Sequence, residues 1–276
     1  KYCEHYYPEM IDNLSTCKSP QGMFGALAKT YYAEKLKIDP SKIFVVSVMP
    51  CTAKKFEITR EEINASKYKD VDVVLTTREL AKMIKKASIE FTELPDSDFD
   101  LPFGIGSGAG VIFGATGGVM EAALRTLSEI IDKKELTKLE FDDVRGVKGI
   151  KEASYVLGGN KINVAVASGL ANAKKVMEMI KSGEKNYHFV DIMACPGGCV
   201  NGGGQPIQPN SVHNYNDVRA LRAASIYAED KNLPLRKSHN NPAVQELYKD
   251  YLGEPCGHKS HEILHTHYHG RSKYGK

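Results

Sequence analysis

Apolar positions along the chain follow two patterns: short β-branched runs, and longer stretches in which they recur at helical spacing. The runs at residues 42–49, 71–75 and 188–193 predict strands, and those at 153–157 and 161–167 predict a β-hairpin around Gly158 and Gly159. The first run is apolar throughout, as in a strand buried on both faces of a parallel sheet. Helical spacing predicts helices over residues 20–36, 76–87, 119–131, 170–182, 216–231 and 242–252. The order of these elements indicates an α/β protein with two lobes, each a mainly parallel sheet flanked by helices.

Two of the predicted helices carry capping signals in their first turn. Ser19 followed by Pro20 is a typical N-cap and first-turn pair, and Thr76 with Glu79 has the spacing of a capping box. These signals fix the expected helix starts more firmly than the apolar spacing does.

The composition limits the class of protein. With 276 residues, 42% hydrophobic and 26% charged, the chain can form one large core or two lobes, which excludes a disordered or fibrous protein. The net charge of +3 is spread along the sequence, so we expect no nucleic-acid partner. No apolar stretch is long enough to span a membrane. We expect lobes formed by about residues 1–140 and 141–215, with a helical wrap over residues 216–276.

The start of the chain and its cysteine content bear on where the protein acts. The first residue is lysine, and the opening residues have the pattern of a helix inside a domain, so we expect a longer parent protein. Six cysteines in a chain of this length do not indicate a disulfide-stapled secreted domain. We expect a cytoplasmic protein, with export left open by the missing upstream sequence.

Two predicted strands end in a cysteine. The segments at residues 46–51 and 190–195 share the pattern Val-x-x-Met-x-Cys, which ends in Cys51 and Cys195. Ligands of open parallel sheets lie beyond the carboxyl ends of the strands. We therefore expect the two half-sheets to face each other and to hold a metal cofactor in the cleft between the lobes.

The segment at residues 191–206 holds two cysteines and five glycines within ten residues, 195–204. Its glycines allow bare backbone to approach a bound group and to direct N–H groups at sulfide. Cys51, Cys195 and Cys199 then supply three soft ligands, which fit an iron–sulfur centre better than a harder ion. Cys17 is a candidate for the fourth ligand, with a small residue in a turn as the alternative.

Charged and thioether side chains accompany these cysteines. A helix that starts at Cys51 would place Lys54 and Glu57 on the same face, with a cation beside the metal and a carboxylate behind it. The alternative is a solvated Lys–Glu pair. Met49 and Met193 each precede a cysteine by two residues, and either packs against the metal group or belongs to the core.

Two other motifs are assigned to structure rather than chemistry. The glycine-rich stretch at residues 102–118 follows no apolar strand, which disfavours a dinucleotide site. The histidine-rich tail at residues 257–269 invites a zinc hypothesis, but a docked, hydrogen-bonded segment is favoured because the only thiol near it is Cys256.

Five segments resemble the catalytic domain of the iron-only, or [FeFe], hydrogenases. The stretches MPCTAKKFE at residues 49–57 and MACPGGCVNGGGQP at residues 193–206 are similar to the second and third signatures of that family. Residues 13–21, 112–125 and 257–268 resemble other parts of the same domain. The similarity covers essentially the whole chain.

This resemblance implies an H-cluster, in which a [4Fe-4S] cubane is joined by a cysteine to a two-iron subcluster carrying CO, CN and a bridging dithiolate. Cys51 and Cys195 would ligate the cubane, Cys199 would bridge the two parts, and Lys54 would donate to a cyanide. Ser15 and Glu57 match positions close to the ligands or on the proton route. The two-iron pocket would be lined by Ser19, Gln21, Met49, Pro50, Phe113 and Met193.

The family's first signature, TSCCP, which carries the fourth cubane ligand, is absent from this sequence. We therefore expect a partial catalytic domain, completed by an upstream segment or a second chain. The implied reaction is the reversible reduction of protons to hydrogen, with a ferredoxin-like electron carrier and maturation proteins as partners. The alternatives are a non-catalytic iron–sulfur scaffold or assembly protein, and a sensory hydrogenase-like protein.

Overall fold

The computed structural model describes residues 1–146 and 149–272. The chain divides into two compact units: Lys1–Leu75 with Leu247–Lys276, and Thr76–Glu246. These boundaries differ from the expected divisions at residues 140 and 215, because the first unit combines the two ends of the chain. Among the described residues, no helix is long and apolar enough to cross a membrane.

The first unit begins with helix α1 (Tyr2–Tyr6) and a 3-10 turn (Pro8–Asn13). Helix α2 (Pro20–Leu27) continues through a π turn (Ala28–Tyr32) into α3 (Ala33–Leu36), which confirms the helix predicted over residues 20–36. Ser19 caps α2, because its side chain accepts a hydrogen bond from the Gly22 backbone N–H.

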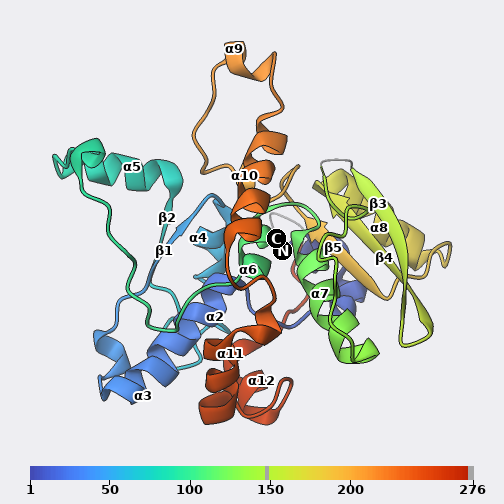
Figure 1. Cartoon of the computed structure of the whole chain (residues 1–276), viewed down its shortest axis with the longest axis horizontal. Coiled ribbons are helices and arrows are strands. Elements are labelled where there is room, and N and C mark those ends of the chain that lie inside the picture. Colours follow the sequence, from blue (N-terminus) through green and yellow to red (C-terminus); the bar gives the residue numbers. More distant parts are fainter. Residues whose placement is uncertain (147–148, 273–276) are drawn as a thin grey trace. The chain divides into compact units, whose positions relative to one another are not determined.

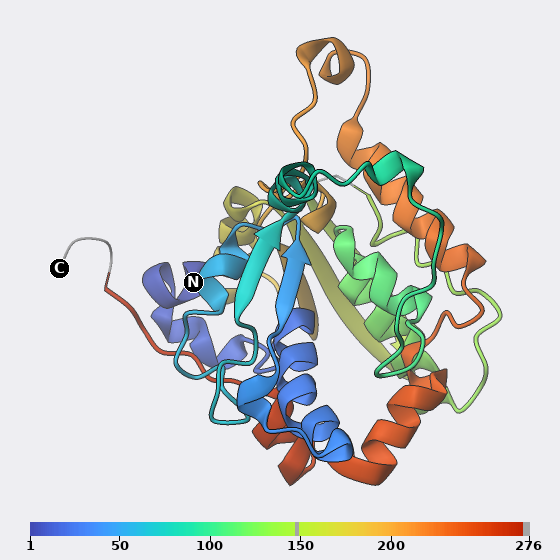
Figure 2. The ribbon, with the colours of Figure 1, turned by 90° about the vertical axis from the view of Figure 1, so that its left-hand side faces the viewer.

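A two-stranded sheet follows, formed by β1 (Val46–Met49) and β2 (Val73–Thr76), and the two strands run in the same direction (Figure 2). The strand predicted over residues 42–49 is wrong in its first half, where Asp39 caps a 3-10 turn (Pro40–Lys42). The expectation that it is buried on both faces is also wrong, since Val46 is 47% and Val48 is 44% exposed. Helix α4 (Ala53–Glu57) begins shortly after β1.

The core of the first unit joins its two chain segments. Buried Ala26 of α2 packs with Leu252 of the second π turn (Tyr248–Leu252) and with Ile263 and Leu264 of α12 (His258–Leu264). The tail then pairs with residues 16–18, since the Lys18 N–H donates to the Leu264 carbonyl at 2.9 Å. The tail is therefore a docked, hydrogen-bonded segment, as its sequence predicts.

The second unit contains a three-stranded sheet in the order β3-β4-β5. Strands β3 (Ile150–Leu157) and β4 (Asn160–Ser168) form the predicted antiparallel hairpin. Strand β5 (Phe189–Met193) runs parallel to β4 after the crossover helix α8 (Leu170–Lys181), so this sheet is mixed. Helix α7 (Gly118–Asp132) contributes buried Met120 and Leu124 to a cluster with Val164 and Val166 of β4.

The remaining elements of the second unit are mostly helical. Helix α5 (Thr77–Lys86) begins with the predicted capping box. Short helix α6 (Gly108–Val111), a 3-10 turn (Ile112–Gly114) and helix α10 (Val218–Asn232) pack together, and short helix α9 (Asn210–His213) lies at the tip of an extended segment (Figure 1). Helix α11 (Pro242–Leu247) runs into the second π turn, which confirms the helix predicted over residues 242–252. Further 3-10 turns lie at Phe91–Glu93, Cys199–Asn201 and Ser238–Asn240.

A buried ion network fixes α10 to α7. Arg125 of α7 is fully buried and lies 2.6 Å from Glu121 and 2.8 Å from Asp230 of α10. Arg236 also contacts Asp230, at 2.6 Å. A buried guanidinium needs such partners, because an unpaired charge in the core is costly. The network therefore determines where α10 lies within the second unit.

Candidate functional site

The first group of candidate residues lies where β1 ends. Met49 is the last residue of the strand, and half-buried Cys51 follows it after Pro50. Helix α4 starts at Ala53 rather than at the cysteine, because Thr52 occupies the N-cap position. Lys54 therefore lies in the first turn of the helix, immediately after the strand-end cysteine.

Glu57 accepts hydrogen bonds from three of the predicted site residues. Lys54 Nζ lies 2.6 Å from Glu57 Oε2, Gln21 Nε2 lies 3.1 Å from Oε1, and the Ser19 hydroxyl donates to the same Oε1. The side chains of Lys54 and Glu57 are 20% and 24% exposed, so they form a half-buried pair rather than a fully solvated one. The Oε1 atom of buried Gln21 has no hydrogen-bond partner within the described part of the chain. The structure thus assembles Ser19, Gln21, Lys54 and Glu57 into one polar cluster.

Ser15 and Cys17 lie on the exposed side of the first unit, against the tail. The Ser15 hydroxyl accepts from the Cys17 N–H at 3.3 Å, and the Ser15 carbonyl accepts from the Tyr268 hydroxyl at 3.0 Å. Cys17 forms an isolated antiparallel bridge with His265. Cys17 is therefore an exposed residue whose backbone pairs with the tail. This placement is closer to the alternative, a small residue in a turn, than to a metal ligand.

The second group of candidates belongs to the loop after β5, which we call the cysteine loop (residues 195–206). Met193 ends β5, and Cys195 and Cys199 are half-buried. Between them, Gly197 and Gly198 have φ angles of 89° and 100°, which L side chains rarely adopt. The backbone between Cys195 and Cys199 can therefore make this turn only because glycine occupies both positions.

The cysteine loop packs against the turn that carries Phe113. A Cβ atom on Gly198 would lie 2.7 Å from both the Gly114 carbonyl oxygen and the Thr116 backbone nitrogen. The Thr116 N–H donates to the Gly197 carbonyl at 3.2 Å. The structure therefore brings half-buried Phe113 and the two loop cysteines into one region of the second unit.

Two polar residues that the sequence analysis missed support this region. The Ser168 hydroxyl accepts from the Gly197 N–H at 2.9 Å. Asp191 of β5 accepts from the Met120 N–H of α7 at 3.3 Å, and burial raises its pKa to about 6. Ser168 is the last residue of β4 and Asp191 is the central residue of β5, and neither belongs to a sequence motif that would indicate its role.

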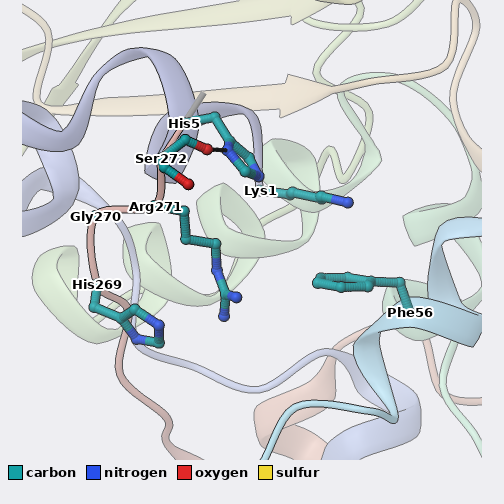
Figure 3. A pocket seen from close by; sticks show the side chains of 7 residues that line it. All are labelled: Lys1, His5, Phe56, His269, Gly270, Arg271 and Ser272. Carbon is teal, nitrogen blue, oxygen red and sulfur yellow. Dashed lines mark hydrogen bonds between the residues drawn. The ribbon is translucent and has the colours of Figure 1, made fainter. Parts of the chain in front are cut away.

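A cavity of about 370 Å³ in the first unit is lined by other residues. Its walls include the side chains of Lys1, His5, Phe56, His269 and Arg271 (Figure 3). His5 Nδ1 lies 2.7 Å from the Ser272 carbonyl oxygen, which ties the tail to α1. The cavity is a basic hollow at the docked tail, and the predicted site residues are not part of its wall.

The candidate cysteines are divided between the two units. Cys51 belongs to the first, and Cys195 and Cys199 belong to the second. Within residues 1–146 and 149–272, no three His, Cys, Asp or Glu side chains are grouped to hold a metal ion. The expectation that the three cysteines meet in one cleft stays a prediction.

Thiol ligands after a strand and on a glycine-rich loop are typical of iron–sulfur proteins, which is the class that Cys51, Cys195 and Cys199 indicate. Residues 1–203 match the family described as the iron only hydrogenase large subunit, C-terminal domain, and residues 216–271 match the iron hydrogenase small subunit. The chain therefore belongs to the iron-only hydrogenase family, and the resemblance seen in the sequence is confirmed.

Individual relatives support the same family. The chain is 50% identical to the NADP-reducing hydrogenase subunit HndD of Solidesulfovibrio fructosivorans over 99% of its own length and 46% of the relative. It is 54% identical to the periplasmic [Fe] hydrogenase large subunit of Nitratidesulfovibrio vulgaris, over 76% of this chain and 50% of that one. The chain thus spans about half the length of these curated relatives.

The solved structures give the same result for the fold. A structure of HydA that describes stepwise [FeFe]-hydrogenase H-cluster assembly superposes with a TM-score of 0.81 at 41% identity, over 98% of this chain and 73% of the other. The predicted α/β class is confirmed. An iron–sulfur cluster assembly factor of Drosophila persimilis is also similar, but at 32% identity.

Proposed function

We propose that this chain is part of a hydrogenase catalytic domain that reduces protons to hydrogen reversibly. The observation that carries the proposal is the polar cluster in which Glu57 holds Lys54, three residues after Cys51. A non-catalytic iron–sulfur scaffold has no cyanide for such a lysine to bind. The higher identity to hydrogenases than to the assembly factor points the same way.

The cofactor of the proposal is the H-cluster, and the donor set fits it. Three thiol side chains at strand ends and on a glycine-rich loop are soft ligands, which suit iron and sulfide better than a hard ion. In the proposal Cys51 and Cys195 would hold the cubane, and Cys199 would hold the cofactor where its two parts join. The fourth cubane ligand comes from an upstream segment or a second chain. When bound, the H-cluster would pass on electrons received from a one-electron carrier and would supply the site at which protons are reduced.

The polar cluster anchors the cofactor in this proposal. Lys54 would donate to a cyanide, and the hydrogen bond to Glu57 would hold the Lys54 ammonium in place for that contact. Ser19 and Gln21 fix the Glu57 carboxylate, which leaves the Gln21 Oε1 atom available to a bound group. Met49, Pro50, Phe113 and Met193 provide the less polar walls that exclude water.

Proton movement is assigned to Ser15 and Glu57. The Ser19 hydroxyl donates a hydrogen bond to Glu57, so a hydroxyl and a carboxylate are in the contact that proton transfer requires. Ser15 lies on the exposed side of the same unit, where it can exchange protons with solvent. These two residues would form the inner and outer parts of the route.

A ferredoxin-like electron carrier and maturation proteins are the proposed partners, and the cytoplasm is the proposed location. The reaction requires a one-electron donor, and the cyanide and carbonyl groups must be made elsewhere and delivered. The periplasmic relative shows that the family is not restricted to one compartment.

Infrared spectroscopy of the anaerobically purified protein after maturation tests the proposal. We expect bands of iron-bound carbonyl and cyanide that shift under hydrogen. Cys199→Ser should lose these bands and keep the broad iron–sulfur absorption of the cubane, whereas Cys256→Ser, at an exposed cysteine outside the cysteine loop, should keep both. Iron–sulfur absorption without carbonyl or cyanide bands in the unmodified protein would instead support a scaffold function.

A further inference from the structure

Two arginine side chains bind backbone carbonyls of the cysteine loop in the segment that follows Cys199. The first is Arg78, in the first turn of α5. Its Nη2 atom donates to the Gly203 carbonyl oxygen at 2.7 Å, and its backbone N–H donates to the Gly204 carbonyl oxygen at 3.2 Å. Both partners lie in the run of three glycines, where no side chain is present to hold the backbone.

The second is Arg222, in α10. Its Nη1 atom donates to the Val200 carbonyl oxygen at 3.2 Å, and its Nη2 atom donates to the Pro206 carbonyl oxygen at 3.0 Å. Arg222 thus joins the two ends of the glycine run from one guanidinium group. Since α10 is fixed to α7 by the buried Arg125 network, this attachment point is rigid.

The guanidinium groups of Arg78 and Arg222 contact carbonyl oxygens of the cysteine loop. In the part of the chain that the structure describes, neither Arg78 nor Arg222 forms an ion pair with a carboxylate. Arg219, one turn earlier on α10, differs, because it pairs with Asp217 at 3.0 Å. Two uncompensated positive charges therefore lie on the backbone that follows Cys199.

We propose that Arg78 and Arg222 are positioning residues that clamp residues 199–206 and so fix the Cys199 sulfur, while their charges favour the reduced form of the bound cluster. Hydrogen bonds from a charged donor are stronger than those between neutral groups, which suits them to order a glycine-rich segment. A positive charge near an iron–sulfur cluster stabilises the state with one more electron. The clamp stands on the geometry alone, and the effect on the cluster rests on the proposed function.

Hydrogen exchange of the cluster-free protein, measured by mass spectrometry, tests the clamp. Arg222→Gln and Arg78→Gln should each raise the exchange rate of amides in residues 199–204 by about tenfold, because local opening of a loop depends on the bonds that close it. The controls are Lys231→Gln on α10 and Lys82→Gln on α5, which remove one charge from an exposed position of the same helix. Both controls should stay within about twofold of the unmodified protein.

Redox titration of the cluster-loaded protein tests the charge effect. Arg222→Gln should lower the ratio of reduced to oxidised cluster by about threefold at a fixed potential, as expected for one charge removed near the site. Arg222→Lys keeps the charge and loses the two-carbonyl geometry, so it should restore this ratio while exchange of the loop stays fast. A purely structural role would not separate the two readouts in this way.

Two results would overturn the proposal. Exchange of residues 199–204 at the rate of the unmodified protein in both Gln variants would show that the arginines do not hold the loop. Equal acceleration in β4 would show general destabilisation rather than a clamp. If the unmodified protein takes up no cluster, the proposed function fails, but the exchange experiment still decides the clamp.

Discussion

The buried carboxyl of Asp191 gives the second unit a pH dependence that can be calculated. Burial raises its pKa from 3.8 to about 6, so the folded protein binds a proton there more tightly than the unfolded chain does. The contribution of Asp191 to the free energy of unfolding is fully present below about pH 4. It falls as pH rises through 6 and is lost above that pH. A shift of about two units amounts to about 3 kcal/mol at about 1.4 kcal/mol per unit. The side chain is only 6% exposed, so solvent screening does not reduce this figure much.

Asp191→Asn removes the charge and keeps an oxygen that can accept from the Met120 N–H. Relative to the unmodified protein, we expect the variant to gain roughly half of those 3 kcal/mol between pH 5 and pH 7.5. The chain has no tryptophan, so urea unfolding is followed by circular dichroism. Asp98→Asn, at an exposed aspartate, is the control and should show no such change. A stability difference between Asp191→Asn and the unmodified protein that stays constant with pH would refute the reasoning.

Three further substitutions test other parts of the structure. Gly198→Ala should cost at least about 2 kcal/mol of stability by urea unfolding, because the added Cβ meets backbone atoms at 2.7 Å; an unchanged midpoint would contradict the packing of the cysteine loop. Ser19→Ala loses a helix cap and a bond to the Glu57 carboxylate, roughly 2–4 kcal/mol together, whereas Ser19→Thr keeps the hydroxyl and most of the stability in the same assay. Arg125→Met removes the buried cation that Glu121 and Asp230 share and leaves each carboxylate with one less buried arginine, Arg145 and Arg236 respectively. This loss should cost about 3–5 kcal/mol, seen as a thermal midpoint lower by roughly 6–20 °C; a smaller loss than Ser19→Ala would argue against the network.

The elements that sequence predicts well are those with local signals. The capping box at Thr76, the hairpin turn at Gly158 and the start of the helix after Ser19 lie where they are predicted, although the first hairpin strand begins three residues earlier, at Ile150 rather than residue 153. The strand expected over residues 42–49 begins only at Val46, because apolar spacing does not reveal that Asp39 caps a 3-10 turn that extends to Lys42. The exposure of Val48 could not be predicted either, because a run of valines is compatible with a sheet that is covered on one face or on both.

In the candidate site, too, sequence predicts the local contacts and misses the long-range ones. Spacing alone indicates the pairing of Lys54 with Glu57, but it does not reveal that Ser19 and Gln21 bind the same carboxylate from 38 and 36 residues away. Arg222 reaches Val200 from 22 residues away and belongs to no motif. Long-range hydrogen bonds of this kind leave no periodic trace, so only the folded chain shows them.

The first unit is formed by two segments that are far apart in the chain, and this has a consequence for biosynthesis. Ser15 and Tyr268 are 253 residues apart, yet their hydrogen bond helps to dock the tail. At about 5–20 residues per second, a ribosome needs roughly 13–50 s to make the intervening chain. The second unit, a single continuous segment, can form its core during that time, whereas residues 15–18 still lack the strand that pairs with them. The region around Ser15 is therefore completed after translation of the tail, and its folding has a far higher contact order than that of the β3-β4 hairpin.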